Sequence, residues 1–210
     1  MKDYAEKYYN NLFAGLSAVK VTDKHKNGLD FYQGIEAACG LIQSQAESGC
    51  KLMFIGNGAS AAISSHMAAD YLKNGGLNTV TFNNSSLLTC MGNDYGYEHV
   101  FEKPIEISAQ KGDVLIAISS SGKSENILLA VDAAKNKRCA VLTLSGFDPD
   151  NPLSSLGDIN FYVPVKSYGI VEIVHHSICH CILDTIVRFS KSQILELSKV
   201  SSPKIKWSFK

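Results

Sequence analysis

The strongest constraint on the fold is an alternation of short apolar runs with helical segments through the middle of the chain. The apolar runs lie at 51–56, 79–82, 113–118, 140–144 and 158–163. Segments with apolar residues at helical spacing follow three of them, at 60–72, 86–91 and 125–136. This alternation predicts a parallel β-sheet covered by helices on both faces, a doubly wound α/β fold.

Helical periodicity also flanks this central region. Residues 4–19 and 31–48 predict two opening helices separated by the polar segment 22–28, and residues 169–191 predict a closing helix. We therefore expect one domain over residues 1–191. Residues 192–210 mix serine and lysine with one proline, which predicts a peripheral C-terminal tail that is either partly ordered or packed on a partner subunit.

The charge pattern narrows the classes of function. The chain has 210 residues, 20 of them basic and 20 acidic, so it offers no basic surface for a nucleic acid. Four of the first seven residues are charged, and no apolar run reaches transmembrane length, so we expect a soluble cytoplasmic protein without a membrane partner. The six cysteines form no CxxC pair and are expected to be reduced and buried.

Two loops follow predicted strands and precede predicted helices, where ligands bind in open parallel sheets. The first is GNGAS at 56–60, in which Ser60 could cap the next helix, and the second is SSSGKS at 119–124. Hydroxyls and free amides at a helix N-terminus are typical of a phosphate site. Neither loop has the spacing of a P-loop or of GxGxxG, so a single small phosphate fits better than ATP or a dinucleotide.

Candidate metal ligands occur on two predicted helices. His66 and Asp70 lie four residues apart, and Glu172, His176 and His180 rise at the same spacing. Histidines and carboxylates on two helices could bind zinc or a similar divalent ion. Each pair alone is more often a solvated pair than a ligand set, and the case for ligands depends on the nearby phosphate loop.

A third polar segment, GNDYGYE at 92–98, lies between helical stretches. Its residues are typical of a plain turn. As a functional loop, it would present Asn93 and Asp94 to the hydroxyl groups of a sugar.

Taken together and in this order, GNGAS, His66-x3-Asp70, GNDYGYE, ISSSGKS and Glu172-x7-His180 resemble the motifs of the SIS (sugar isomerase) domain. The resemblance covers residues 1–190 approximately and is greatest to phosphoheptose isomerases, which act on sedoheptulose 7-phosphate. It implies a flavodoxin-like sheet, zinc in the site, and a homotetramer with active sites at subunit interfaces.

The resemblance also implies roles for individual residues. The phosphate-binding positions are Ser119, Ser120, Ser121 and Ser124. Further substrate contacts fall on Asn57, Gly58, Ala59, Asn93 and Asp94. The metal ligands fall on His66, Asp70, Glu172 and His180.

Several positions depart from the pattern of that family. Asp70 replaces a glutamate, and Glu172 replaces a glutamine. Both keep oxygen ligands, but the shorter Asp70 carboxylate changes the reach of a proton-transfer group. Asp70 and His180 are the first candidates for proton transfer, with Glu172 as the substitute.

Two changes fall in the loops, where Ala59 replaces a glycine and Lys123 replaces an asparagine. Lys123 either adds a positive charge for the phosphate or points into solvent. His176 is expected in the core or at an interface, because the resemblance gives the ligand role to His180, and the role of His175 stays open.

These observations predict a metal-dependent aldose–ketose isomerase of a sugar phosphate. The expected reaction converts sedoheptulose 7-phosphate to D-glycero-D-manno-heptose 7-phosphate, for heptose in lipopolysaccharide or capsule. One alternative is isomerisation of a different phosphosugar. The other is a non-catalytic SIS-type protein that senses phosphosugars or binds a replication initiator.

Overall fold

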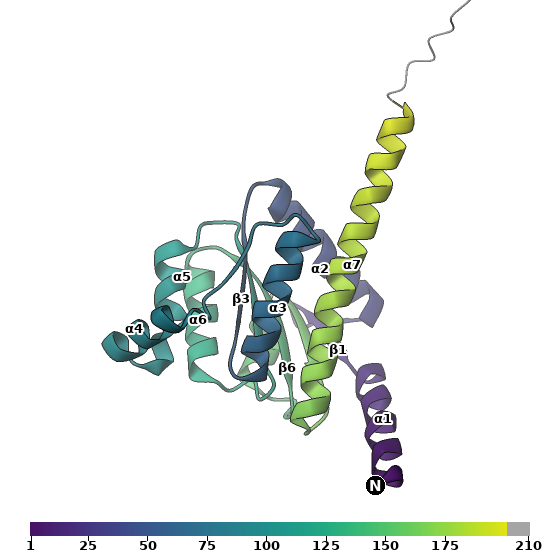
Figure 1. The fold of residues 1–210 in the computed structure, drawn as a ribbon, viewed down its shortest axis with the longest axis vertical. Coiled ribbons are helices and arrows are strands. Elements are labelled where there is room, and N and C mark those ends of the chain that lie inside the picture. The colour runs from purple at the N-terminus through teal and green to yellow at the C-terminus, as the bar shows by residue number, and fades with distance from the viewer. Residues whose placement is uncertain (201–210) are drawn as a thin grey trace, which may run out of the picture.

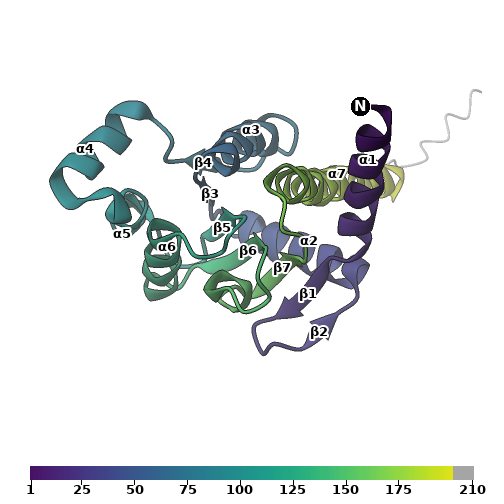
Figure 2. The same ribbon diagram turned by 90° about the horizontal axis from the view of Figure 1, so that it is seen from below.

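The computed structural model describes the backbone of residues 1–200 and the side chains of residues 1–190. A seven-stranded sheet forms its centre, in the order β2-β1-β7-β6-β5-β3-β4 (Figures 1 and 2). The strands are β1 (Lys20–Asp23), β2 (Gly28–Leu29), β3 (Leu52–Gly56), β4 (Thr79–Thr81), β5 (Val114–Ser119), β6 (Ala140–Gly146) and β7 (Ile159–Val163). The helices are α1 (Lys2–Ser17), α2 (Phe31–Glu47), α3 (Ala59–Lys73), α4 (Ser85–Tyr95), α5 (Glu102–Ser108), α6 (Glu125–Asn136) and α7 (Tyr168–Val200), with short 3₁₀ turns η1 (Tyr97–His99) and η2 (Pro152–Ser155).

The five strands from β3 to β7 are parallel, which confirms the predicted sheet. β3 pairs with β4 on one side and with β5 on the other, so the chain reverses its direction of travel across the sheet at β3. The parallel order β4-β3-β5-β6-β7 is the flavodoxin-like order 2-1-3-4-5, in which ligands bind at the reversal between the first and third strands. This strand order therefore points to the ends of β3 and β5 as the candidate ligand-binding position.

The core has two layers, one on each face of the sheet. Leu52 and Phe54 of β3 pack with α2, α3 and α7, whereas Met53 and Ile55 pack with α5 and α6. This alternation follows from the two-residue period of a strand. Both faces are covered, which explains why the strands are continuous apolar runs.

The opening of the chain differs from the prediction. The polar segment 22–28 was expected to separate two helices, but residues 20–29 form the hairpin of β1 and β2. β1 adds to the sheet antiparallel to β7, with Val21 buried opposite Phe161. β1 is short and has one buried side chain, so it has no apolar alternation to detect and the pattern could not predict it.

Helices α1 and α4 lie at opposite ends of the molecule in Figure 2. α1 buries only Gly15 and exposes three aromatic side chains, those of Tyr4, Tyr9 and Phe13. No residue of α4 is fully buried. Both helices therefore present surfaces that this chain covers only in part.

Helix α7 continues to Val200, so it passes the predicted end at 191 and includes the first part of the expected tail. The rest of that tail, 201–210, lies outside the described residues. The segment Tyr168–Ser190 is long and apolar enough to cross a membrane by length and composition, and half of its apolar window is buried inside the structure. A core helix of a soluble protein has the same character, and the packing of α7 on the sheet is of that kind.

Candidate active site

A pocket of about 230 Å³ opens where β3 and β5 end, beside the N-termini of α3 and α6. It is smaller than the roughly 300–1,000 Å³ typical of drug-sized ligands, so it suits a small polar molecule. Its lining comes from both predicted loops and from the start of α7: Asn57, Gly58, Ala59, Ser60, Ser119, Ser120, Ser121, Ser124, Tyr168 and Glu172. The structure thus brings together seven of the nine predicted substrate-binding residues. The other two, Asn93 and Asp94, do not line this pocket.

The serine loop after β5 has the character of an anion site. The hydroxyl of Ser119 accepts a hydrogen bond from the backbone N–H of Gly122 at 3.2 Å and lies 3.4 Å from the hydroxyl of Ser124. The hydroxyl oxygen of Ser120 is buried without a partner among the described residues. Ser124 occupies the N-cap of α6, so free amides and the positive end of the helix dipole face the same space.

The loop is held in shape by Asn151, which the sequence analysis did not single out. Its amide donates to the backbone carbonyls of Gly146 and Asp148, and its side-chain oxygen accepts from the N–H of Ser154. Gly122 packs directly against this side chain with a φ of 62°. A glycine is required there because a Cβ would overlap Asn151.

The loop after β3 is positioned by a second amide. Asn57 and Asn126 exchange two hydrogen bonds between their side chains, at 2.8 and 2.9 Å. The phenol of Tyr97 also donates to the side-chain oxygen of Asn57 at 3.1 Å. Asn126 is only 3% exposed, so this buried network fixes Asn57 on the pocket wall.

Helix α3 begins differently from the prediction. Ser60 was expected to cap it, but the N-cap is Gly58, with a φ of 55° and no side-chain bond. Ser60 lies inside the helix, buried on the pocket wall. The amides of the first turn are therefore left for a ligand rather than used by a side-chain cap.

Lys123 does not contribute a free charge to the pocket. Its ammonium pairs with Asp148 at 2.9 Å, and Lys166 pairs with the other oxygen of the same carboxylate at 2.7 Å. These two partners, Lys166 first, lower the pKa of Asp148 to about 2. Of the two roles considered for Lys123, the exposed position fits the second, because its side chain lies at the surface in this ion pair and does not line the pocket.

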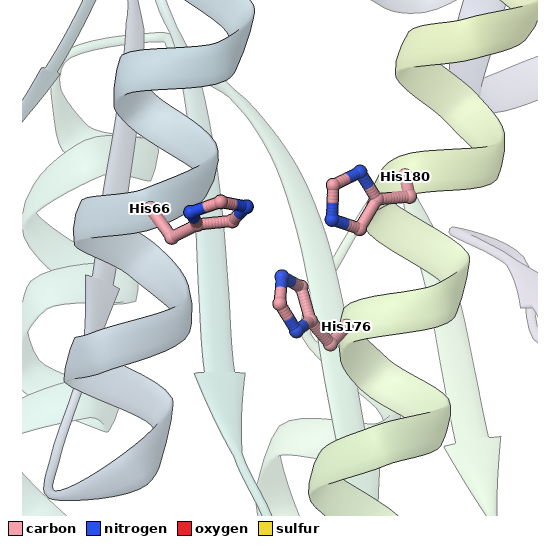
Figure 3. A group of neighbouring side chains, drawn as sticks. All are labelled: His66, His176 and His180. Carbon is pink, nitrogen blue, oxygen red and sulfur yellow. The ribbon is translucent and has the colours of Figure 1, made fainter.

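Three histidines from α3 and α7 lie beside each other. One ring nitrogen from each of His66, His176 and His180 falls within 4.8 Å of the other two (Figure 3). Ring centroids are 4.7 to 5.4 Å apart. Burial, and then the neighbouring His180 and His66, lower the pKa of His176, which favours the neutral imidazole that binds metals.

The two carboxylates of the predicted metal set have different surroundings. Asp70 contacts His66, with 3.3 Å between a carboxylate oxygen and Nε2, but it is not part of the three-histidine group. Glu172 lines the pocket together with the serines, and burial raises its pKa. The structure therefore brings together His66 and His180 of the predicted set, adds His176, and places Glu172 with the substrate-binding loops.

The adjacent His175 has a different environment. It is fully buried, and its Nε2 lies 3.0 Å from the backbone carbonyl of Ser145, a partner that requires the N–H on that nitrogen. Burial lowers its pKa to about 4. His175 is therefore a neutral core residue.

The segment that contains Asn93 and Asp94 is helical rather than a turn. Residues 92–95 form the last turn of α4, whose first turn is capped by the side chain of Asn84. Asn93 and Asp94 are exposed and hydrogen-bond to each other at 2.8 Å. The sequence analysis placed the start of this helix within one residue but ended it at 91, before Asn93 and Asp94.

The fold and the pocket define an α/β protein with a small, serine-rich pocket at the reversal point of its sheet. A model of the SIS domain matches residues 8–146. The chain belongs to the SIS domain family.

Within that family the similarity is to phosphoheptose isomerases. The chain is 38% identical over 158 residues to the phosphoheptose isomerase of Helicobacter hepaticus, covering 72% of this chain and 80% of that protein. It is 33% identical over 197 residues to the enzyme of Histophilus somni, covering 91% and 98%. The solved phosphoheptose isomerase of Neisseria gonorrhoeae superposes with a TM-score of 0.75 at 28% identity, covering 88% and 97%.

Proposed function

We propose that the protein is an aldose–ketose isomerase that converts sedoheptulose 7-phosphate to D-glycero-D-manno-heptose 7-phosphate. The observation that carries this proposal is the pocket itself, in which an anion-binding serine loop and a carboxylate of raised pKa face one cavity. The similarity to phosphoheptose isomerases supports the choice of substrate.

Binding and chemistry are divided between the two ends of the substrate. Ser119, Ser120, Ser121 and Ser124 hold the phosphate, and the binding energy of this remote group fixes the reacting carbons. Among the described residues, no lysine or arginine lines the pocket, so the charge is balanced by hydroxyls, amides and helix N-termini. Asn57, held by Asn126, orients the sugar hydroxyls.

The reaction moves a proton from C1 to C2 of the ketose. A base removes a proton from C1, the C2 carbonyl becomes the second hydroxyl of an enediol, and reprotonation at C2 with loss of the O1 proton gives the aldose. Glu172 serves as the base in this proposal, and its position on the pocket wall together with a pKa raised by burial supports that role. His180, about two helical turns further along α7, is the candidate acid. Asp70, which contacts His66, is the other candidate for proton transfer.

The residues between α3 and α7 fit a divalent metal ion such as zinc, since they offer imidazole nitrogens next to carboxylate oxygens. When bound, such an ion polarises the carbonyl of the substrate. Asn93 and Asp94 lie on α4, outside the lining of this pocket, and we propose that they contact a substrate held by a neighbouring subunit.

We also propose an oligomeric state, a cellular location and a pathway for the enzyme. The exposed aromatic side chains of α1 and the unburied helix α4 support a homotetramer with active sites between subunits. The balanced charge supports an enzyme without a nucleic-acid partner, which we assign to the cytoplasm. Its product would enter heptose synthesis for a surface polysaccharide, and residues 1–191 would act as one domain.

Proton NMR of the zinc-loaded protein with sedoheptulose 7-phosphate tests this function. We expect the anomeric proton of an aldoheptose 7-phosphate to appear, and in D₂O a deuterium to enter at C2. Glu172→Gln should slow turnover by roughly 10²–10⁴-fold, the usual contribution of a general base. Glu47→Gln, at the exposed end of α2, is the matched control.

Asp70→Asn, run in parallel, separates the two carboxylates. If it abolishes turnover and Glu172→Gln does not, Asp70 is the base. No product from a protein that is stabilised by inorganic phosphate would reject this substrate. A screen of other sugar phosphates by thermal stabilisation would then be required.

A further inference from the structure

The three-histidine cluster differs from the metal set that the family resemblance implies. His66, His176 and His180 each offer a ring nitrogen to a common space, within 4.8 Å of one another. Figure 3 shows them turned toward each other from α3 and α7. Among the described residues, neither Asp70 nor Glu172 belongs to a group of this kind.

A second observation concerns the nitrogen atoms of His176. Its Nε2 is buried and has no hydrogen-bond partner among the described residues. A buried imidazole nitrogen is expected to have a partner, because its desolvation is otherwise uncompensated. The rings that neighbour His176 are those of His66 and His180. Each neutral imidazole carries one nitrogen lone pair, and a cation bound between the rings would accept these lone pairs.

We propose that the metal of this protein is held by three histidines, His66, His176 and His180, and that Glu172 is not a ligand. The inference rests on the proposed function, since it assigns the ligands of the metal used there. Nitrogens bound to one tetrahedral zinc lie roughly 3.3 Å apart, given zinc–nitrogen distances of about 2.0–2.1 Å. Small rotations of the rings therefore complete the centre from the arrangement seen.

This ligand set has chemical consequences. Three neutral imidazoles select zinc, cobalt or nickel over magnesium or calcium, which prefer oxygen. They also leave the full double positive charge of the ion uncompensated, and a fourth position open to a substrate oxygen. Asp70, 3.3 Å from Nε2 of His66, orients that imidazole.

Because Glu172 is not a metal ligand in this proposal, its carboxylate is available for a separate role. Its carboxylate lies on the wall of the serine pocket and is one helical turn from His176 on α7. A carboxylate bound to a cation is a weak base, whereas a free one at a raised pKa can accept the C1 proton. The three-histidine centre and Glu172 thus divide carbonyl activation and proton removal between different side chains.

Zinc affinity, measured without sugar by competition with a chromophoric chelator, tests the ligand set. His176→Ala should weaken zinc binding by more than the roughly 10–100-fold expected for loss of a group that only orients a ligand. Asp70→Asn should fall within that range, and Glu172→Gln should change the affinity less than either. His25→Ala, an exposed histidine in the β1–β2 turn, is the control for loss of any imidazole.

His176→Gln provides a variant of similar size, and circular dichroism of the metal-free proteins checks that each variant folds. Equal zinc affinity in His176→Ala, His176→Gln and the parent protein would overturn the proposal. So would a loss of affinity in Glu172→Gln that matches the loss in His176→Ala. A His176-dependent zinc site in a protein that fails to turn over sedoheptulose 7-phosphate would support the ligand set and reject the proposed function alone.

Discussion

Gly122 offers a quantitative test of how the phosphate loop is built. A Cβ at this position would overlap the side chain of Asn151, and the backbone φ of 62° is itself unfavourable for an L-residue. The left-handed backbone costs about 1–2 kcal/mol. Displacing Asn151 removes four side-chain hydrogen bonds, each worth about 1 kcal/mol net.

We therefore expect Gly122→Ala to lower the free energy of unfolding by about 5 kcal/mol, the sum of strain and lost hydrogen bonds. Gly49→Ala is the matched control, because Gly49 has a φ of 79° and no atom within 4 Å of an added Cβ. It should cost only the strain of about 1–2 kcal/mol. Urea unfolding followed by circular dichroism measures both variants.

The double variant Gly122→Ala/Asn151→Ala gives a further check. Truncating Asn151 removes the overlap, so the two substitutions should cost less together than the sum of their separate effects. Equal destabilisation by Gly122→Ala and Gly49→Ala would refute the reasoning, because it would mean that contact with Asn151 adds nothing. Additive effects in the double variant would refute it as well.

Three other variants or conditions test the site and the core. Ser120→Ala removes a buried hydroxyl without a partner, so it should leave the stability of the unliganded protein within about 0.5 kcal/mol while reducing the thermal stabilisation by inorganic phosphate. Tyr97→Phe removes one donor to Asn57, worth about 0.5–1.5 kcal/mol, and should lower kcat/KM by roughly 2–12-fold in the NMR assay. Burial holds the pKa of His175 near 4, below its ordinary 6.5, so the unfolded state takes up a proton first as the pH falls. The metal-free protein should lose about 1.4 kcal/mol of stability per unit from this residue between pH 6.5 and 4, and His175→Gln should remove that part of the slope in urea titrations at several pH values.

Much of the fold could be predicted from the sequence because its strands are buried on both faces. Such strands are unbroken apolar runs, and the helices between them have a clear period, so β3 to β7 and α3 and α6 were found within a few residues. The β1–β2 hairpin was missed because its pairing partner β7 lies far away in the chain. α4 was placed correctly, but its end was set too early, since a helix that buries no residue has little apolar pattern.

The site was predictable where its residues are contiguous. The serine loop and GNGAS line one pocket as expected. Asn126 and Asn151 were missed because their contacts join segments that only the tertiary fold brings together. His175 and His176 could not be separated by spacing, since a rotation of about 100° per residue sends one into the core and the other toward α3.

The spacing of Glu172, His176 and His180 on α7 has a consequence for substrate length. These positions succeed one another by about one turn, a rise of roughly 6 Å for four residues. The phosphate end of a substrate is anchored by a different part of the fold, the loop between β5 and α6. Moving a metal ligand from one turn of α7 to the next would therefore shift the metal while the phosphate site stays in place. The position of the ligands along α7 thus sets the length of carbon chain that fits between the phosphate and the carbonyl.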